Sequence, residues 1–261
     1  MAEIIARRQF MPMYIWLDIA FLLVFAFLLL WKKKYMTVLV GFIMGIVYMI
    51  VDYGIFHLLC NSRSISDGYS LFWVLLWMSM SYGFTNFTWI WLWISKDKHL
   101  FEWSFLILSW WFCCPLIVQT FAQGQTPIII QRTTGAYHGY MAIILFVGYL
   151  ALIIYNLIQK DKQKRVNILW LLAIGILVQF GWEVGLLVGG IRSAGFTTLG
   201  EKLGPLVVNS LLETNLGMPY VYIFFISFSR RFSEQLKKKG KVQSFTQRIA
   251  DNNAERVSNK N

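Results

Sequence analysis

Four acidic residues lie inside long apolar stretches of the chain, and they are the first candidates for chemistry. They are Asp18, Asp52, Glu183 and Glu213. An ionisable side chain inside a membrane is costly, so such residues commonly belong to a functional site. Carboxylates in this setting can hold a cation, carry a coupling proton, or act as an acid and a base. No Lys or Arg lies inside the same stretches to neutralise them.

The four carboxylates share a similar depth in the expected membrane. Each lies about five to seven residues from the same end of its apolar stretch, which is roughly 8–11 Å at 1.5 Å per residue. A single acid near a helix end can instead reach the headgroups or bond a neighbouring helix. That alternative applies most to Asp18, the shallowest of the four. We therefore predict a shared pocket that contains Asp52, Glu183 and Glu213.

Polar and aromatic residues accompany the three acids and complete the predicted substrate- or proton-binding site. They are Asn215, Trp182, Tyr82, His57 and His138. Aromatic faces combined with carboxylates suit organic cations or carbocations. Structural roles are the alternative, because membrane aromatics commonly face lipid and histidines at helix ends commonly lie at the interface.

Span seven of the chain contains Gly217 and Pro219 shortly after Glu213. Proline removes a backbone donor and glycine weakens a helix, so carbonyl groups are freed at this depth. Interrupted helices beside ionisable groups form binding sites in transporters. We predict an interruption here that belongs to the site, and a plain kink that aids packing is the alternative.

Composition decides which class of protein holds these residues. The 261 residues are 57% hydrophobic and only 14% charged, whereas soluble domains carry about 25% charged residues. A soluble enzyme and a disordered chain are therefore excluded. The net charge of +11 does not indicate nucleic acid, because the basic residues lie in short runs between apolar stretches. The three cysteines form no CxxC pair, and we expect neither a metal nor a cofactor.

Seven apolar stretches are long enough to cross a hydrocarbon core of about 30 Å. They cover residues 13–31, 36–59, 70–94, 100–121, 137–159, 167–189 and 206–228. We predict an all-α integral membrane protein, with a bundle of seven transmembrane helices in residues 1–229. A basic cytosolic tail at 230–261, partly disordered, should follow.

The two halves of the bundle share a pattern. Gly45 precedes Asp52 in span two much as Gly175 precedes Glu183 in span six. With span four as a connector, spans one to three and five to seven have the same orientation. This arrangement suggests a 3+1+3 parallel repeat.

The distribution of Lys and Arg predicts the orientation in the membrane. Fifteen basic residues, counted as far as Lys241, lie on the side that holds the loops after spans one, three and five and the tail. They are Lys32, Lys33, Lys34, Lys96, Lys98, Lys160, Lys162, Lys164, Arg165, Arg230, Arg231, Lys237, Lys238, Lys239 and Lys241. The six on the other side are Arg7, Arg8, Arg63, Arg132, Arg192 and Lys202. Because cytoplasmic loops are enriched in basic residues, we expect the N-terminus outside and the C-terminus in the cytoplasm.

In layout, the chain resembles the small fungal seven-span terpene cyclases. It has a comparable length and orientation, with acids late in span two (Asp52) and in span seven (Glu213, followed by Tyr220). Span two lacks that family's Trp-Glu pair, which stands in span six here as Trp182-Glu183. The resemblance implies an enzyme in which a protonated carboxyl group starts a cyclisation and aromatic faces stabilise the cation.

These observations favour a small-solute transporter or binding protein, multi-pass in a prokaryotic inner or plasma membrane. The solute would be an organic cation or an amphipathic molecule that enters from outside. An intramembrane enzyme acting on a lipid or prenyl substrate, with Asp52 and Glu213 as acid and base, is the alternative. A membrane sensor or accessory subunit is the third hypothesis. The expected partners are the lipid bilayer and a small-molecule or lipid ligand. The sequence has no phosphate loop or nucleotide-binding motif, which excludes an ATP-driven pump for this chain alone.

Overall fold

The structure is a computed structural model that describes residues 6–132, 137–192 and 196–239. Seven long helices make up most of this described chain. They are α1 (Pro12–Trp31), α2 (Tyr35–Met49), α3 (Leu71–Ile94), α4 (Leu100–Phe121), α5 (His138–Ile158), α6 (Ile168–Val188) and α7 (Leu199–Lys239). The first six coincide with the predicted spans, once α2 is taken together with its continuation to Leu59. The seven helices are confirmed, while a membrane crossing by all seven stays a prediction. Residues 1–219 and 220–261 form two compact units, and all the site residues lie in the first.

Several of the helices are suited to crossing a membrane. Five described segments are long and apolar enough: α1, α2 with its continuation to Leu59, α4, α5 and α6. The chain is therefore a multi-pass membrane protein. Helix α3 is more polar, and it packs against α1, α2, α4 and α6. A helix surrounded by protein can carry Ser, Thr, Asn and Tyr because its polar groups bond neighbouring helices rather than face lipid.

The second span changes its winding where it approaches the site. Helix α2 continues without a gap into a π-helix, η1 (Ile50–Leu59), which contains Asp52. Segments with this wider i→i+5 turn are rare and frequently lie at functional sites. The interruption predicted near Gly217 is wrong, because α7 is one continuous helix that includes both Pro205 and Pro219. Membrane helices tolerate proline where neighbouring groups satisfy the freed carbonyl.

Helices α2 and α3 are held backbone to backbone by glycines. A Cβ atom on Gly83 of α3 would lie 2.6 Å from the Cα atom of Gly45 in α2. A Cβ atom on Gly45 would in turn lie 2.7 Å from the sulfur of Met80. Small residues that let membrane helices approach this closely fix their register. The contact thereby sets the positions of Asp52 and Tyr82 relative to each other.

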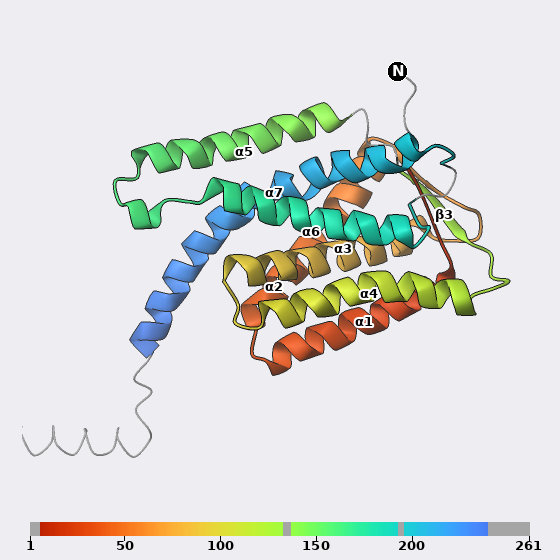
Figure 1. The fold of residues 1–261 in the computed structure, drawn as a ribbon, viewed down its shortest axis with the longest axis horizontal. Coiled ribbons are helices and arrows are strands. Elements are labelled where there is room, and N and C mark those ends of the chain that lie inside the picture. Colours follow the sequence, from red (N-terminus) through yellow and green to blue (C-terminus); the bar gives the residue numbers. More distant parts are fainter. Residues whose placement is uncertain (1–5, 133–136, 193–195, 240–261) are drawn as a thin grey trace, which may run out of the picture. The chain divides into compact units, whose positions relative to one another are not determined.

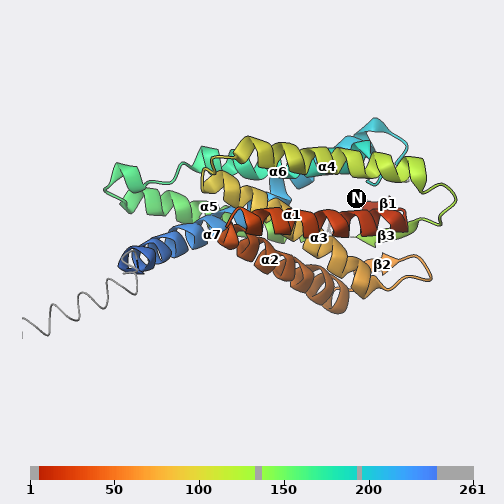
Figure 2. The same cartoon turned by 90° about the horizontal axis from the view of Figure 1, so that it is seen from below.

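A small antiparallel sheet lies at the end of the bundle where α1 begins and α4 ends (Figure 1, Figure 2). Its strands are β1 (Ala6–Phe10), β2 (Arg63–Ile65) and β3 (Ile128–Arg132), in the order β1-β3-β2. Arg8 pairs with Ile130, and Arg63 pairs with Arg132. The prediction of an all-α protein is corrected by this sheet, which the long apolar stretches do not indicate because each strand is only three to five residues long.

Strand β1 alternates in burial, which shows which way the sheet faces. Arg8 and Phe10 are buried, whereas Arg7 is exposed. Since successive side chains of a strand point to opposite faces, one face of β1 is directed into the protein. The sheet therefore carries basic side chains from loop segments into the end of the helix bundle.

Candidate functional site

Asp52 is held by two arginines of the sheet, and we call these three residues the Asp52 cluster. Arg63 donates from Nε at 3.1 Å and from Nη2 at 2.8 Å to Oδ1 of Asp52. Arg132 donates from Nη2 to both carboxylate oxygens at 2.7 Å. Asp52 is 5% exposed and Arg63 is 4% exposed. Charge-assisted bonds from two guanidinium groups stabilise Asp52 as a carboxylate.

The two arginines of this cluster respond differently to their surroundings. Burial and the charge of Arg132 lower the pKa of Arg63 to about 10, against the opposing effect of Asp52. Burial also acts to lower the pKa of Arg132, yet the negative charges of Asp52 and Glu213 hold that pKa above its usual value. Both guanidinium groups are therefore protonated at neutral pH.

A second group of charges lies on α6, on α7 and in the turn after α6. We call Gln179, Glu183, Arg192 and Glu213 the Glu213 cluster. Arg192 donates from Nε to one oxygen of Glu183 at 2.9 Å and from Nη2 to the other at 2.8 Å. Glu183 is 1% exposed. It also accepts from the side-chain amides of Asn209 and Gln179, each at 3.3 Å. Glu183 is thus fully paired.

Glu213 differs from the other two acids because its nearest partner is neutral. Gln179 donates from Nε2 to Oε2 of Glu213 at 3.0 Å. The Oε1 atom of Gln179 accepts from the Tyr82 hydroxyl at 2.7 Å, and Tyr48 donates to that hydroxyl at 3.4 Å. Within the described residues, Glu213 forms no ion pair, and it is half-buried. A hydrogen-bonded chain from Tyr48 therefore ends at an unpaired carboxylate.

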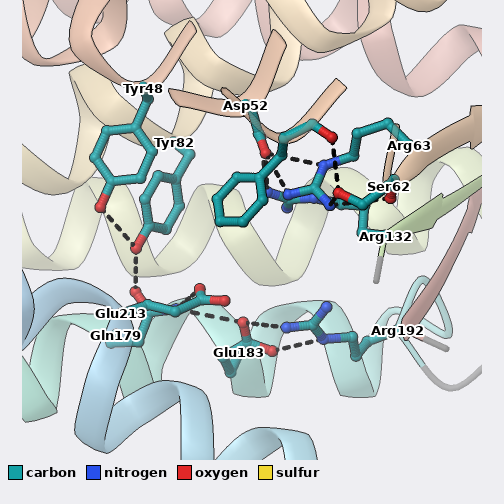
Figure 3. A network of polar contacts seen from close by, with 11 residues as sticks. Tyr48, Asp52, Ser62, Arg63, Tyr82, Arg132, Gln179, Glu183, Arg192 and Glu213 are labelled. Carbon is teal, nitrogen blue, oxygen red and sulfur yellow. Dashed lines mark hydrogen bonds and ion pairs between the residues drawn. The ribbon is translucent and has the colours of Figure 1, made fainter. Parts of the chain in front are cut away.

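The two clusters face each other across the interior, as Figure 3 shows. Arg132 belongs to the Asp52 cluster but also interacts electrostatically with Glu213. The structure thus brings the three predicted acids, Asp52, Glu183 and Glu213, into one charged network. It also adds partners from loops that are distant in the sequence.

Arg8 of β1 lies in the same network but differs from the other arginines. It is 4% exposed, and its Nε atom is buried without a partner. No hydrogen bond or ion pair of its side chain is found in the described part of the chain. Burial and the positive charges of Arg132 and Arg192 lower the pKa of Arg8 to about 9, although Glu183 and Glu213 oppose this effect. Arg8 is therefore a buried cation at neutral pH whose Nε donor has no partner among the described residues.

The four arginines are the functional candidates that the sequence analysis did not identify. In the sequence, these arginines contribute only to the predicted orientation in the membrane. The absence of Lys and Arg from the spans predicts that the acids have no partners. The loops supply these partners instead: Arg63, Arg132 and Arg192 form ion pairs with the acids. A signal was present, because the smaller basic group is almost entirely Arg, whereas the larger group is mostly Lys. Arg is preferred where carboxylates are paired in buried sites.

Two of the predicted aromatic residues adjoin the network. The Tyr82 hydroxyl bonds Gln179, as described above. The ring of Trp182 lies 5.9 Å from the ring of Tyr82 and 5.2 Å from that of Trp111 between centroids. The Nε1 atom of Trp182 is buried, and none of the described residues accepts its hydrogen.

The other predicted candidates lie apart from the carboxylates. Asn215 accepts from the Tyr149 hydroxyl at 3.3 Å and donates to a backbone carbonyl. His57 lies beside Tyr53, with ring centroids 5.2 Å apart. His138 begins α5 and is half-buried. Within the described part of the chain, no hydrogen bond or ion pair connects these three to the charged network.

Asp18, the shallowest acid, joins three helices rather than the network. The indole groups of Trp77 and Trp110 donate to its two oxygens at 2.9 and 3.1 Å. These bonds connect α1 with α3 and α4. The structural alternative considered for Asp18 therefore fits its contacts best.

A cavity of about 450 Å³ lies at the sheet end of the bundle. It is lined by β1, the beginning of α1, the end of α4 and the turn after α6. A second cavity, of about 20 Å³, is lined by residues that include Arg8 and Trp182. We call this second cavity the inner cavity and the first one the outer cavity. Phe10, Tyr14 and Ile191 line both cavities, so the two are adjacent.

Comparisons with known protein families, with curated proteins and with solved structures found no match to this chain. Its function is therefore inferred from the chemistry of the site.

Proposed function

We propose that this membrane protein binds or transports a small amphipathic solute, which enters at the end of the bundle that carries the sheet. The observation that supports this most is the cavity of about 450 Å³ at that end. Its volume is within the range of about 300–1,000 Å³ that is typical of small-molecule sites. Mainly apolar side chains line it, and the charged network begins beside it, so it suits a molecule with an apolar body and a polar group.

The proposed orientation puts the sheet outside the cell and the Lys-rich loops in the cytoplasm, in the membrane of a prokaryote. The excess of basic residues on the Lys-rich side supports it. A cysteine introduced as Gln123→Cys, in a variant without the native cysteines, should react with an impermeant reagent in intact cells. Protection of that cysteine would reverse the orientation. The 3+1+3 repeat stays a prediction.

The pairing of the acids bears on the charge of the solute. An organic cation needs a free carboxylate, but Asp52 and Glu183 already pair with arginines. Glu213 alone is left, and we propose that it carries the charge or proton that changes during the cycle. The amphipathic solute is therefore better supported than the organic cation.

The intramembrane enzyme is less well supported than solute binding. A general acid must be protonated before it reacts. Asp52 accepts four bonds from two guanidinium groups, and these stabilise its ionised form. Glu213 is the acid that could still deliver a proton.

The experiment that tests the proposed function is to fill the cavity. Val118 lines the cavity and is buried, whereas Leu116 lies on the same helix, is half exposed and does not line it. Each residue is replaced by Trp, and the molecules that co-purify in mild detergent are identified by untargeted mass spectrometry. Val118→Trp should lose a solute that the parent protein and Leu116→Trp retain. The same set of molecules in all three proteins would contradict the proposal.

A further inference from the structure

The unused donors of Arg8 and Trp182 lie at one place, the inner cavity beside the charged network. A guanidinium group has five N–H donors and an indole has one, and neither group can accept a hydrogen bond. Buried donors are nearly always satisfied in folded proteins, so each exception requires a reason. Of the buried donors without a partner among the described residues, Arg8 Nε and Trp182 Nε1 belong to residues that line the same small space, and a bound acceptor would satisfy both.

The charge around Arg8 points to the sign of this acceptor. The network contains four arginines (Arg8, Arg63, Arg132 and Arg192) and three acids (Asp52, Glu183 and Glu213), so its own acids leave one positive charge unbalanced. Asp18 lies outside the network and is held by two indole donors, although one of these, Trp77, also lines the small cavity. Burying a charge without a partner costs several kcal/mol. If Arg8 served packing alone, an apolar residue at this position would fill the space without the cost of a buried charge. A negative charge bound beside Arg8 would offset that cost while the arginine is kept.

We infer that the solute carries a carboxylate group, which binds the Arg8 guanidinium and the Trp182 indole N–H while the apolar body of the solute occupies the outer cavity. This inference rests on the proposed function and names the chemical class of its solute. A carboxylate is flat and meets a guanidinium group with two parallel hydrogen bonds.

The sizes of the two cavities support a carboxylate over a larger anion. The inner cavity of about 20 Å³ has room for little more than one water-sized group. A carboxylate needs only small shifts of the side chains between the cavities, whereas a tetrahedral phosphate brings additional oxygens into an apolar neck. Phe10, Tyr14 and Ile191 form that neck, and they would pack against the first carbons of the solute.

The test measures binding of radiolabelled phenylbutyrate to the full chain in nanodiscs of neutral phosphatidylcholine. The competitors are phenylbutylamine and phenylbutyl phosphate, which carry the same body with a cationic or a larger anionic group. Unlabelled oleate in the nanodisc is a third competitor. We expect the amine and the phosphate to compete at least about tenfold more weakly than unlabelled phenylbutyrate. Stronger competition by oleate than by phenylbutyrate would identify the membrane as the source of the carboxylate, and the reverse would identify dissolved solute.

The central variant is Arg8→Gln, and Arg7→Gln is its matched control because Arg7 is the exposed neighbour on the same strand. Arg8→Gln should weaken phenylbutyrate binding by about tenfold or more, while Arg7→Gln binds as the parent does. Without ligand, Arg8→Gln should unfold at a higher temperature than the parent, because it removes an unpaired buried charge. An arginine with a purely structural role would show the opposite shift. Trp182→Phe replaces the indole by a smaller aromatic ring, removes the N–H donor and should weaken binding several-fold.

The outcomes separate this inference from the proposed function. Unchanged phenylbutyrate binding in Arg8→Gln, or a lower unfolding temperature for that variant, overturns the carboxylate site. Binding of the amine in preference to the carboxylate also overturns it, while solute binding itself is upheld. If no probe binds, yet Val118→Trp still loses a co-purifying molecule, the carboxylate is wrong and the cavity is a site for another solute. If no probe binds and the cavity variants carry identical molecules, both are wrong.

Discussion

The Asp52 cluster and the Glu213 cluster contain the same kinds of group but differ in how completely their charges are paired. Two arginines surround Asp52, whereas in the Glu213 cluster one arginine serves two glutamates and is bonded to Glu183 alone. A fully paired cluster can hold helices and sheet together but has no group free to react. An incompletely paired cluster costs stability and leaves a carboxylate able to change its charge. We therefore expect a structural role for the Asp52 cluster and a functional role for the Glu213 cluster, although both consist of the same kinds of charged residue.

The largest effect is expected from Asp52→Asn. The change leaves Arg63 and Arg132 buried without a counter-charge, and breaking a buried ion pair in this way costs about 3–5 kcal/mol. We expect a large fall in the unfolding temperature and in the yield of monodisperse protein. Asp67→Asn, at an exposed acid in the loop after β2, is the control and should leave both unchanged. An unaltered unfolding temperature in Asp52→Asn would show that the cluster does not hold the fold.

Removal of the whole Asp52 cluster tests whether its role is structural. Replacing Asp52 by Leu together with Arg63 and Arg132 by Met should recover much of the stability that Asp52→Asn loses, because well-packed apolar residues commonly substitute for a complete buried ion-pair group. The recovered protein should still bind solute if the cluster is structural. Loss of binding with recovered stability would move the function to the Asp52 side.

Glu213→Gln should show the reverse pattern, with a large effect on function and a small one on stability. The amide keeps the shape of the side chain and can accept the bond from Gln179, so we expect a change of about 1 kcal/mol or less in the free energy of unfolding. Transport or solute release should be lost if Glu213 changes its charge. Glu102→Gln, at an exposed glutamate in the first turn of α4, is the matched control. Full activity in Glu213→Gln would show that the carboxylate of Glu213 is not needed for function and that the two clusters do not differ in this respect.

The sequence allowed the helices to be predicted to within one residue at most ends, because about twenty consecutive apolar residues leave little choice of structure. The three acids could also be predicted, because a charged residue within an apolar span is recognised from the sequence of that span alone. Their partners were not predictable in this way. Arg8, Arg63 and Arg132 lie in one sheet only because β3 pairs with both β1 and β2, which are distant from it in the sequence. Such pairing leaves no periodic pattern in the sequence.

The helix ends that were wrong have local explanations. Helix α7 begins before the predicted span, at Leu199, and continues beyond it, to Lys239. These additional segments contain Lys and Glu, so an apolar criterion excludes them although they form helix readily. The π-helix at Asp52 was not predicted because no sequence pattern announces the wider turn. The preference for Arg over Lys in the segments at the sheet end of the bundle is the sequence feature that indicates the partners of the acids.

A smaller effect is expected where the Tyr82 hydroxyl group bonds Gln179 of the Glu213 cluster. Tyr82→Phe removes the donor to Oε1 of Gln179 but keeps the ring beside Trp182. Loss of one hydrogen bond of this kind costs about 1 kcal/mol, and Thr214 still donates to the same oxygen. We expect a modest fall in unfolding temperature and a several-fold change in activity, measured beside Trp182→Phe. A complete loss of activity would show that the tyrosine itself takes part in solute binding or proton transfer.

The smallest effect should come from the ion pair at the opposite end of the bundle, between Lys34 and Asp97. Burial acts to raise the pKa of Asp97, but the bonds from Lys34 and from the backbone of His99 outweigh it and hold the pKa below its usual value. A carboxylate whose pKa is lowered by folding stabilises the protein above its unfolded pKa of about 3.9 and loses that contribution as the pH falls through the folded value. Partly exposed pairs of this type contribute about 0–1 kcal/mol. Lys34→Gln should therefore lower the unfolding temperature slightly at pH 7, and the difference should disappear as the pH falls through the lowered folded pKa of Asp97. A loss as large as that of Asp52→Asn would remove the contrast between buried and peripheral ion pairs.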